Sequence, residues 1–567
     1  MAQPYVIIQT NGSDQADEWI RLGVEAQVAG KFADAERHYR HALRLDPRSA
    51  VATQNLAITF AQLGNTHEGI LAIERATIFD DSHAVIQVNR AFMNLEADRI
   101  EEALAAAKYA VSISKDDDIY GYINSRLALA MISATAGYPE NAVPLYRDIL
   151  AKDPKHPIAN ANCAFVQTLT SATPVELLAQ RKLWYENNRY PGPKQAHAND
   201  KTPDRPIKVG YVGGDFKRHS ASMIFGSVVL NHDKGDVVTY LYSTLPVDPK
   251  LDSVTQQFQT AVGENWRDIS ALSDEAADEL IRKDGIDILV DLAAHTNGGR
   301  LTLFTRKPAP IQVTAWGFAH GTGVPDIDVF LADPIAVRED ERRYYAERVV
   351  DLPCIVSYQP PVEYNIKGTS AMPYFQNDYI TFGSMARYEK LSDACLAAIV
   401  EIMKRVPNSR VHFKDHSLRR PYAIKRIVQA MKEIDKSRLM FSISTSHPDH
   451  LQCIQSCDLM LDTWPHGGGV VTLEALWMGV PICTLNGTQP SCRTASSVLT
   501  LMGHADWIAI TPDDYVKVAV KMANDIAMLN KARRTLRQEL LDSPIVKGYR
   551  EATEAVYRKL WKEYCAK

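Results

Sequence analysis

Small and bulky apolar positions alternate with polar ones in a pattern that repeats about every 34 residues through the first third of the chain. One well-kept copy contains Trp19, Leu22, Gly23, Ala26, Gly30, Ala35, Tyr39, Ala42 and Pro47. The pattern returns in residues 56–76, is degenerate in 91–110, and returns in 129–154 after about five extra residues. Such spacing lets pairs of antiparallel helices pack closely and is typical of tetratricopeptide (TPR) repeats. We predict an α-solenoid over residues 1–170, with about four repeats and a capping helix.

After residue 205 the pattern changes to short apolar runs separated by amphipathic segments. Runs that predict strands begin at Ile207, Val237, Ile286, Ile311, Tyr379, Ser409, Leu439 and Leu459. Short apolar runs that alternate with helices predict doubly wound parallel sheets. We expect two Rossmann-like lobes, over residues 206–360 and 361–567. A helix and a polar, proline-rich linker should precede them, over residues 171–205.

Composition and charge argue against nucleic-acid-binding, secreted and membrane-spanning proteins. The chain has 567 residues, 46% hydrophobic and 23% charged, with a net charge of −5. This length requires more than one core, and without runs of Lys or Arg nucleic acid is not the favoured partner. Eight cysteines without a CxxC pair suggest reduced thiols in a cytosolic protein. The first residues lack a basic, apolar leader, and no apolar run reaches about 18 residues, so we expect neither signal peptide nor membrane span.

One turn carries a clear chemical signal. In the segment LDTWPHGGGVVTLEALW, an aspartate ends an apolar strand, three glycines follow, and a helix opens at Val470. Glycines at a helix N-terminus let a ligand approach bare backbone N–H groups, which favour an anion. Glu474, one turn into this helix, is a candidate ligand-binding carboxylate. The alternative is a tight strand–helix turn with a solvated Glu474.

Several segments, taken together and in order, resemble a known family. They are IKVGYVGGDFKRHS, RKPAPIQVTAWGFAHGTGVPDIDVFLADP, KRVPNSRVHF, the LDTW…EALWMGVPICTL stretch and SCRTASSVL. They are similar to the O-linked N-acetylglucosaminyltransferases of glycosyltransferase family 41, including the SPINDLY branch. The resemblance covers the repeats and nearly all of residues 207–565. It implies a fold of class α + α/β, in which a TPR α-solenoid precedes a GT-B glycosyltransferase of two Rossmann-like lobes.

The resemblance implies a nucleotide-sugar site on the second lobe. Its residues in this sequence are Arg387, Lys390, Thr445, Ser446, His447, His450, Leu451, Gln452, Cys453, Gly468, Gly469, Val470, Val471 and Glu474. Lys390, also a catalytic candidate, and the N–H groups of residues 468–471 would face the diphosphate. Glu474 would hold the ribose, and residues 445–447 and 450–453 would frame the base.

Two departures from the family pattern fall in the glycine turn. Val470 and Val471 stand where the family usually has a Thr-Thr pair, so two hydroxyl donors are missing. Gly469 stands where the family has a histidine, and His466 is not obviously its equivalent. We expect weaker or altered phosphate binding, with the fold unchanged.

On the first lobe, the resemblance implies that His219 is a catalytic residue, as a proton acceptor or as a group that positions the acceptor. The pKa of histidine lies near working pH and suits either role. A capping or loop histidine is the alternative. His295 and His320 fall in loops after predicted strands, where α/β sites gather, and are possible contacts to the sugar or acceptor.

We expect no metal ion as a cofactor. His447 and His450 have the spacing of metal ligands, but the sequence offers no third ligand nearby. Asp326 and Asp328 spell DxD, which binds a cation in another transferase fold. Here they lie in a segment similar to a structural motif of the family, so a structural role is favoured.

The resemblance implies a metal-independent, inverting transferase that moves N-acetylglucosamine from UDP-GlcNAc to Ser or Thr of protein acceptors. The TPR groove would hold the protein or peptide acceptor. Three alternatives stay open. The donor could be GDP-fucose or UDP-glucose, the transferase half could be inactive beside a TPR scaffold, or the solenoid could serve only packing or oligomerisation.

Overall fold

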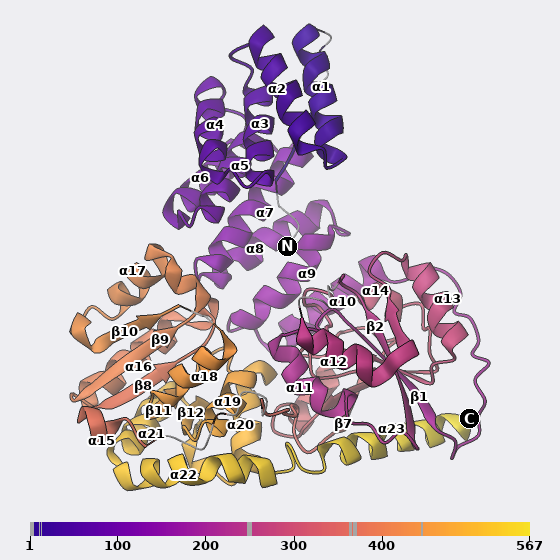
Figure 1. Cartoon of the computed structure of the whole chain (residues 1–567), viewed down its shortest axis with the longest axis vertical. Helices are drawn as coiled ribbons and strands as arrows, with labels where there is room; N and C mark the ends of the chain where they lie inside the picture. The colour runs from indigo at the N-terminus through magenta and orange to yellow at the C-terminus, as the bar shows by residue number, and fades with distance from the viewer. Residues whose placement is uncertain are drawn as a thin grey trace. The chain divides into compact units, whose positions relative to one another are not determined.

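The computed structural model describes residues 5–10, 12, 14–246, 252–361, 366, 371–443 and 446–567. They form two compact units. The first consists of Met1–Val166 with Arg419–Arg426, and the second of Gln167–Leu418 with Ile427–Lys567. Among the described residues up to Val166 the regular elements are helices, whereas the second unit combines helices with two sheets (Figure 1).

Antiparallel helix pairs form the first unit, as the repeats predict. Its helices are α1 (Gln15–Val28), α2 (Phe32–Leu45), α3 (Ala50–Gln62), α4 (Thr66–Phe79), α5 (Ala84–Glu96), α6 (Ile100–Ile113), α7 (Ile119–Thr135), α8 (Pro139–Lys152) and α9 (Pro157–Val166). The turns within the pairs hold a residue with positive φ, namely Gly30, Gly64, Asp98 and Gly137. Glycine adopts this conformation without steric cost. Asp98 in this position is one reason why the third copy looks degenerate in the sequence.

Small residues permit the close packing of the first helix pair. Tyr39 of α2 is fully buried, and its ring lies 2.5 Å from where a Cβ on Gly23 of α1 would be. The Tyr39 hydroxyl donates to Gln27 Oε1 over 2.7 Å, so the buried polar end of the ring is satisfied. A glycine at position 23 is therefore required by the neighbouring aromatic ring.

The first lobe of the second unit is a parallel sheet. Its strands are β1 (Ile207–Gly213), β2 (Val237–Ser243), β3 (Trp266–Asp268), β4 (Ile288–Asp291), β5 (Ile311–Thr314), β6 (Val329–Ala332) and β7 (Arg348–Asp351), in the order β3-β2-β1-β4-β5-β6-β7. The helices are α11 (Ser220–Val229), α12 (Ser253–Val262), α13 (Asp274–Asp284) and α14 (Leu301–Phe304). The strand order reverses between β1 and β4, which is where open α/β sheets bind ligands.

The second lobe repeats this design. Its strands are β8 (Ile380–Ser384), β9 (Ser409–Lys414), β10 (Leu439–Ser442), β11 (Leu459–Leu461), β12 (Ile482–Leu485) and β13 (Ile508–Ala509), in the order β10-β9-β8-β11-β12-β13. Its helices are α15 (Tyr374–Asn377), α16 (Asp393–Arg405), α18 (His447–Gln455), α19 (Val470–Trp477), α20 (Pro490–Leu501), α21 (Pro512–Asn524) and α22 (Ile526–Asp542). A further helix, α17 (Pro421–Ala430), begins in the first unit and ends in the second. The strand order reverses between β8 and β11. The predicted pair of Rossmann-like lobes is confirmed.

Two helices pack on the first lobe although they lie outside residues 206–360. α10 (Pro174–Asn188) holds Arg181, whose Nη1 donates to the Gly321 carbonyl over 3.1 Å. α23 (Tyr549–Cys565) brings Tyr557 to Tyr211 of β1, with 3.2 Å between the hydroxyls. The yellow α23 runs along the first sheet in Figure 1. The first lobe thus takes elements from both ends of the transferase half.

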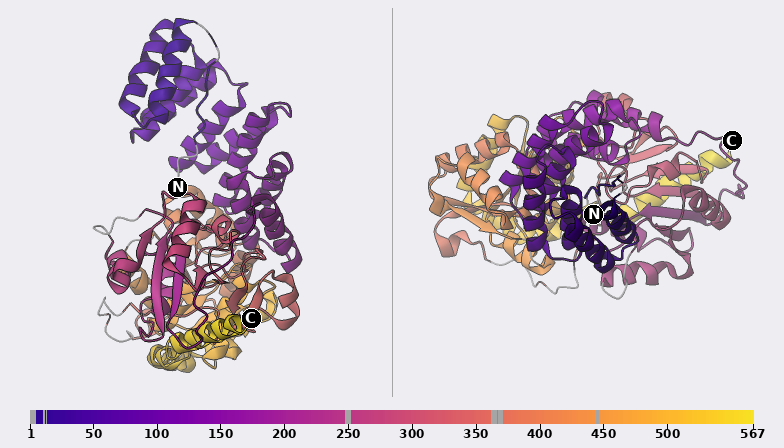
Figure 2. Two further views of the ribbon diagram at one scale, coloured as in Figure 1. Left: turned by 90° about the vertical axis from the view of Figure 1, so that its right-hand side faces the viewer. Right: turned by 90° about the horizontal axis from the view of Figure 1, so that it is seen from above.

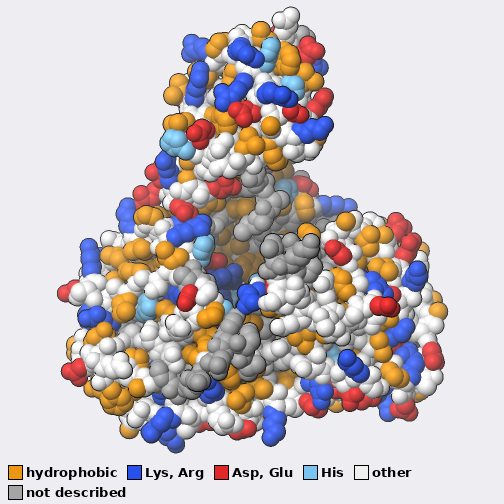
Figure 3. Space-filling model, in the orientation of Figure 1, with side chains coloured by type: hydrophobic (Ala, Val, Ile, Leu, Met, Phe, Trp, Pro, Cys, Tyr) orange, Lys and Arg blue, Asp and Glu red, His pale blue; other side chains and the backbone are white. Residues whose placement is uncertain are grey.

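Figure 2 turns the molecule to show the helix pairs from the side and from above. On the face shown in Figure 3, acidic and basic side chains are interspersed, in keeping with 63 Lys and Arg against 68 Asp and Glu. Among the residues that the structure describes, no helix has the length and apolar character needed to cross a membrane.

Candidate active site

The candidate site lies where the strand order of the second lobe reverses. β8 and β11 are parallel neighbours, so the loops that follow them emerge at the same edge of the sheet. The loop after β8 contains Lys390, and the loop after β11 is the glycine turn. This arrangement brings Lys390 into contact with Gly467, which lies 77 residues later in the sequence.

A buried carboxylate shapes the glycine turn. Asp462 accepts hydrogen bonds from the Gly468 N–H over 2.8 Å and from the Thr484 hydroxyl over 2.7 Å. Burial raises the pKa of Asp462, and these donors oppose the rise. A Cβ on Gly468 would lie 2.5 Å from Val471 Cγ1, whereas one on Gly469 would meet nothing closer than 3.8 Å. Only the first of these two glycines is required by close contacts.

The Gly468 N–H, which was predicted to face a phosphate, donates to Asp462 in this structure. Gly469 is the N-cap residue of α19, and Val470 and Val471 form the first turn of the helix. Both valines are half-buried rather than part of the core. The anion-binding capacity of the turn therefore rests on residues 469–471 and on the positive end of the helix dipole.

Lys390 reaches the glycine turn from the loop after β8. Its Nζ donates to the Gly467 carbonyl over 2.8 Å. Burial, assisted by the charge of Arg387, lowers the pKa of Lys390 to about 7. Arg387 itself is exposed and lies 3.6 Å from Glu389. A nearby anion favours the charged form of a partly desolvated amine, so an anion bound beside this helix N-terminus would raise the pKa of Lys390.

Glu474 is buried, not solvated. Its Oε1 lies 2.6 Å from His447 Nε2 and its Oε2 lies 3.2 Å from His450 Nε2. Burial raises the pKa of Glu474, but hydrogen bonds from the two histidines outweigh burial and leave the pKa below its usual value. Lys414 Nζ lies 3.1 Å from His450 Nδ1 and extends the network. The predicted ribose carboxylate is thus ionised and held in a fixed orientation.

The other predicted base contacts lie on or beside α18. Ser446 caps this helix and exchanges hydrogen bonds with Asp449, while Thr445 lies outside the described residues. Leu451 is fully buried, Gln452 is exposed, and Cys453 Sγ lies 3.7 Å from both ring nitrogens of His412. Leu451 supports the lobe's core, so its side chain is not placed to frame a base.

His219 caps a helix of the first lobe. Its Nδ1 accepts a hydrogen bond from the Ala221 N–H over 3.2 Å and lies 3.4 Å from Asp215 Oδ2. The side chain is 47% exposed, so Nε2 can reach a ligand. α11, which begins directly after His219, contacts α19, so the histidine lies on an element packed against the glycine-turn helix. His219 is therefore both a helix cap, as the alternative predicted, and an imidazole that is accessible to a ligand.

His295 and His320 differ in what they contact. His295 Nε2 donates to the Thr322 carbonyl over 2.7 Å, and burial lowers the pKa of His295 to about 4. This neutral histidine holds the loop after β5. His320 is 1% exposed, and neither of its ring nitrogens has a hydrogen-bond partner among the described residues. Burial lowers the pKa of His320 well below its usual value, so a neutral imidazole has unused donor and acceptor capacity.

Comparison with known proteins places this geometry in a family. The profile of Glycosyl transferase family 41 matches residues 187–356 and 362–553. The chain belongs to glycosyl transferase family 41. A tetratricopeptide repeat profile matches residues 16–49.

Relatives of this family 41 chain include plant proteins. It is 33% identical over 378 residues to a probable UDP-N-acetylglucosamine–peptide N-acetylglucosaminyltransferase SPINDLY of Arabidopsis thaliana, covering 65% of this chain and 41% of that protein. It is 28% identical over 374 residues to the probable transferase SEC of the same plant, covering 64% and 38%. The chain thus spans about two fifths of the length of these relatives. A mutant O-GlcNAc transferase of Thermobaculum terrenum shares the fold, with a TM-score of 0.74, 24% identity and coverage of 98% of this chain and 99% of that one.

Within this family 41 member, the two aspartates of the DxD sequence have structural partners. Tyr185 of α10 donates to Asp326 over 3.1 Å, and Lys194 pairs with the same carboxylate. Asp328 accepts from Lys307 and from the Gln312 N–H, at 2.5 and 2.7 Å. Within the described ranges, no group of three or more His, Cys, Asp or Glu side chains could hold a metal ion.

The sequence did not reveal the orienting role of three residues at the site. Asp462 and Lys414 each stand at the carboxyl end of a buried strand, where a charged residue interrupts an apolar run. His466, within the glycine turn, has its Nδ1 3.2 Å from the Thr168 hydroxyl. Burial and the charges of Lys390 and Arg387 lower its pKa well below the usual value. A charged residue directly after an apolar strand was the signal that could have identified the first two.

The lobes also contact each other away from the glycine turn. Arg493 of α20 is fully buried and pairs bidentately with Glu341 of the first lobe, with 2.9 Å between Nη1 and Oε1. Ser497 donates to Asp333 over 2.9 Å.

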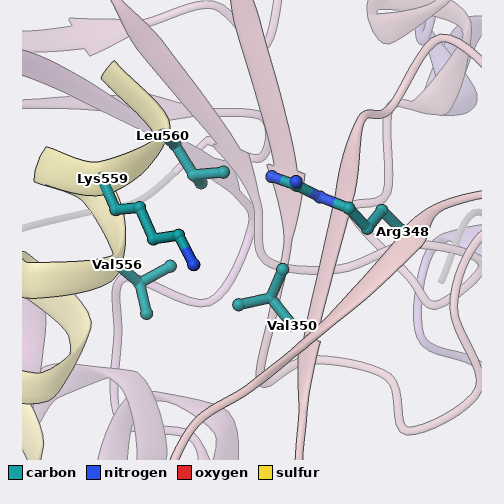
Figure 4. Close-up of a pocket in the computed structure, with 5 residues that line it drawn as sticks. All are labelled: Arg348, Val350, Val556, Lys559 and Leu560. Atoms are coloured by element: carbon teal, nitrogen blue, oxygen red, sulfur yellow. The ribbon is translucent and has the colours of Figure 1, made fainter. Parts of the chain in front are cut away.

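Elsewhere, a cavity of about 70 Å³ lies between β7 and α23, lined by Arg348, Val350, Val556, Lys559 and Leu560 (Figure 4). It is too small for a nucleotide-sugar, since such ligand sites enclose about 300–1,000 Å³.

Proposed function

We propose that this chain transfers N-acetylglucosamine from UDP-GlcNAc to Ser or Thr of protein acceptors, with inversion at the sugar carbon and without a metal ion. The observation that carries the proposal is the pairing of Lys390 with the Gly467 carbonyl at the mouth of α19, beside the buried Glu474. The names of the SPINDLY and SEC relatives support the choice of donor.

The diphosphate would bind between Lys390 and the first turn of α19. Lys390 Nζ would donate to a diphosphate oxygen in place of the Gly467 carbonyl. Other diphosphate oxygens would accept hydrogen bonds from the N–H groups of Val470 and Val471. Negative charge on the diphosphate increases as the bond to the sugar breaks, so a positioned cation stabilises the transition state more than the ground state. These groups supply the positive charge that a divalent cation supplies in other transferases.

The ribose would bind at Glu474. Each carboxylate oxygen can accept more than one hydrogen bond, so contacts to His447 and His450 leave capacity for both ribose hydroxyls. The two histidines would orient the carboxylate and border the base. Since Glu474 is already ionised and held in place, binding requires little reorganisation.

The acceptor hydroxyl would attack the sugar carbon from the side opposite the diphosphate, the carbon–oxygen bond to the diphosphate would break, and the hydroxyl proton would pass to solvent water. His219 Nε2 would contact this hydroxyl, while Nδ1 stays engaged at the helix cap. His320, buried and without a hydrogen-bond partner among the described residues, would contact the donor sugar. The exchange of Lys390→Ala should reduce turnover about 10²-fold or more, as commonly follows the loss of one such electrostatic group.

Calorimetry with UDP, GDP, UDP-GlcNAc, UDP-glucose and GDP-fucose tests the donor. Binding of UDP and UDP-GlcNAc, together with UDP release when protein acceptors are added, is the expected result. If GDP binds tightly and UDP does not bind, the donor is a guanosine diphosphate sugar and not UDP-GlcNAc. The absence of UDP release with a wide set of protein acceptors would count against the transferase reaction.

A second candidate function is a TPR scaffold with an inactive transferase half. Val470 and Val471 motivate it, since they offer no hydroxyl to a phosphate, and Asp462 already uses the Gly468 N–H. This candidate would be favoured by nucleotide binding without turnover across a broad acceptor screen. Transfer to any protein acceptor that is lost in the Lys390→Ala variant would exclude it.

A further inference from the structure

The chain enters the second unit through a short buried segment. Residues 167–172, here called the connecting segment, come directly after α9 and precede residue 187, where the family profile begins. Thr168 within this segment is 1% exposed. Gln489, the buried N-cap residue of α20, donates to the carbonyls of Thr170 and Ala172 over 2.6 and 2.8 Å. These contacts fix the connecting segment on the second lobe.

Thr168 contacts the glycine turn through His466, which lies 298 residues later in the sequence. The Thr168 hydroxyl lies 3.2 Å from His466 Nδ1, and the main chain of Thr168 also forms a hydrogen bond with the ring. Burial lowers the pKa of His466 well below its usual value, and the main-chain bond opposes this fall only in part. The ring is neutral near pH 7, so Thr168 holds it by hydrogen bonds and not by charge.

His466 lies in the part of the turn that Lys390 contacts. The His466 carbonyl accepts from the Thr463 hydroxyl over 2.9 Å, and the Gly467 N–H donates to the Ser491 carbonyl over 3.1 Å. The Gly467 carbonyl accepts from Lys390 Nζ over 2.8 Å. A contact that fixes the ring of His466 therefore helps to fix the peptide group that holds Lys390, one residue later.

The same histidine lies near other groups of the candidate site. The charges of Lys390 and Arg387 act on His466, and His320 adds to their effect. His466 is half-buried, whereas Thr168 behind it is almost fully buried. His466 thus belongs to the wall of the candidate site, and its orientation depends on a residue of the connecting segment.

We propose that Thr168 is a positioning residue of the donor site, which acts through His466 to fix the turn between Lys390 and the first residues of α19. The inference deepens the proposed function and rests on it for the identity of the ligand. Groups that are ordered before the ligand arrives need little reorganisation on binding. The loss of one hydrogen bond that orders them should weaken binding about three- to tenfold.

Thr168→Val tests this role, because valine has nearly the shape of threonine and lacks the hydroxyl. Calorimetry should give a dissociation constant for UDP about three to ten times higher than that of the unmodified chain. Thr168→Ser keeps the hydroxyl and should restore the affinity. Ser171→Ala is the matched control, since it removes an exposed hydroxyl from the same segment and should leave UDP binding unchanged. Equal affinity of Thr168→Val and the unmodified chain would overturn the proposal.

A double-mutant cycle shows whether Thr168 acts through His466. In a chain that carries His466→Leu the partner of Thr168 is gone, so Thr168→Val should not weaken UDP binding further. A loss of the same size in both backgrounds would mean that Thr168 acts by another route, and the proposal would be wrong.

Hydrogen exchange gives a readout that needs no nucleotide. In Thr168→Val the backbone amide of Gly467 should exchange at least threefold faster, while the amides of β1 in the first lobe keep their rates. His466→Leu removes the same contact from the other side and should have the same effect, so either variant alone decides the test. Unchanged exchange at Gly467 would refute the positioning role, whatever the ligand is. If exchange responds in this way but the unmodified chain binds no UDP, the proposed donor is wrong and the positioning role stands.

Discussion

Lys390 is the residue whose charge matters most at the candidate site. Its pKa of about 7 reflects burial first and the neighbouring Arg387 second. An ordinary surface lysine is charged throughout the physiological range, whereas the lowered pKa of Lys390 lets it lose its proton within that range. A diphosphate at the mouth of α19 would restore the charge, because a nearby anion favours the protonated amine.

The first prediction is a pH dependence of nucleotide binding. Below pH 7 Lys390 is charged with or without ligand, so its contribution to affinity is constant. Above pH 7 the ligand-free protein must take up a proton to bind UDP, and the affinity should fall by up to about tenfold per pH unit. Calorimetry between pH 6 and pH 9 measures this slope.

Lys390→Met is the control for that slope. The variant keeps a side chain of similar length and lacks the titrating amine, so only the titration of UDP itself and of unchanged groups remains. The difference between the two pH profiles isolates Lys390. Identical profiles would mean that Lys390 does not face the diphosphate.

A second prediction concerns the valine pair. Val470→Thr with Val471→Thr should tighten UDP binding, since each hydroxyl can donate a hydrogen bond to a charged oxygen, worth about 1.5–3 kcal/mol before desolvation. Both valines are half-buried, and Thr is close to Val in shape, so thermal stability should change little. Weaker binding with a lower Tm would show that these side chains pack inward and do not face the nucleotide.

At the scale of elements, the glycine turn shows which glycines the fold requires. Gly468→Ala places a Cβ 2.5 Å from Val471 Cγ1, and overpacking of this kind costs about 1–3 kcal/mol. Gly469→Ala meets nothing closer than 3.8 Å. The first exchange should lower both Tm and UDP affinity, and the second should leave Tm unchanged. Calorimetry of both variants checks the pair, and an equal loss in both would contradict this account of the turn.

The sequence predicted the long elements better than the short ones. The helix pairs and strands such as β1 and β9 have enough residues to show a period. β3, β6 and β7 have three or four residues each and were missed, although β4, β5 and β11, which are as short, were predicted from apolar runs. Lys390 was named through the family resemblance and Glu474 through the glycine turn, and their roles stay predictions. Asp462, which shapes the turn through contacts with distant residues, was not assigned this role.

At the scale of the whole chain, the boundary between the units lies at Val166 and Gln167. Residues 167–172 belong to the second unit, where Gln489 Nε2 donates to the carbonyls of Thr170 and Ala172 over 2.6 and 2.8 Å. A shortened chain that begins at Pro174 would leave the buried Gln489 without these partners. A buried amide that loses its partners costs about 1–3 kcal/mol, so the cut belongs before Gln167.

The last prediction concerns a chain shortened to residues 167–567. It keeps Lys390, the glycine turn and Glu474, so it should bind UDP with the affinity of the full chain. If the repeats hold acceptors, transfer to full-length protein acceptors should fall far more than transfer to short peptides, because a short peptide needs only the transferase unit. Parallel losses for proteins and short peptides, in a shortened chain that binds UDP normally, would assign the repeats a role other than acceptor binding.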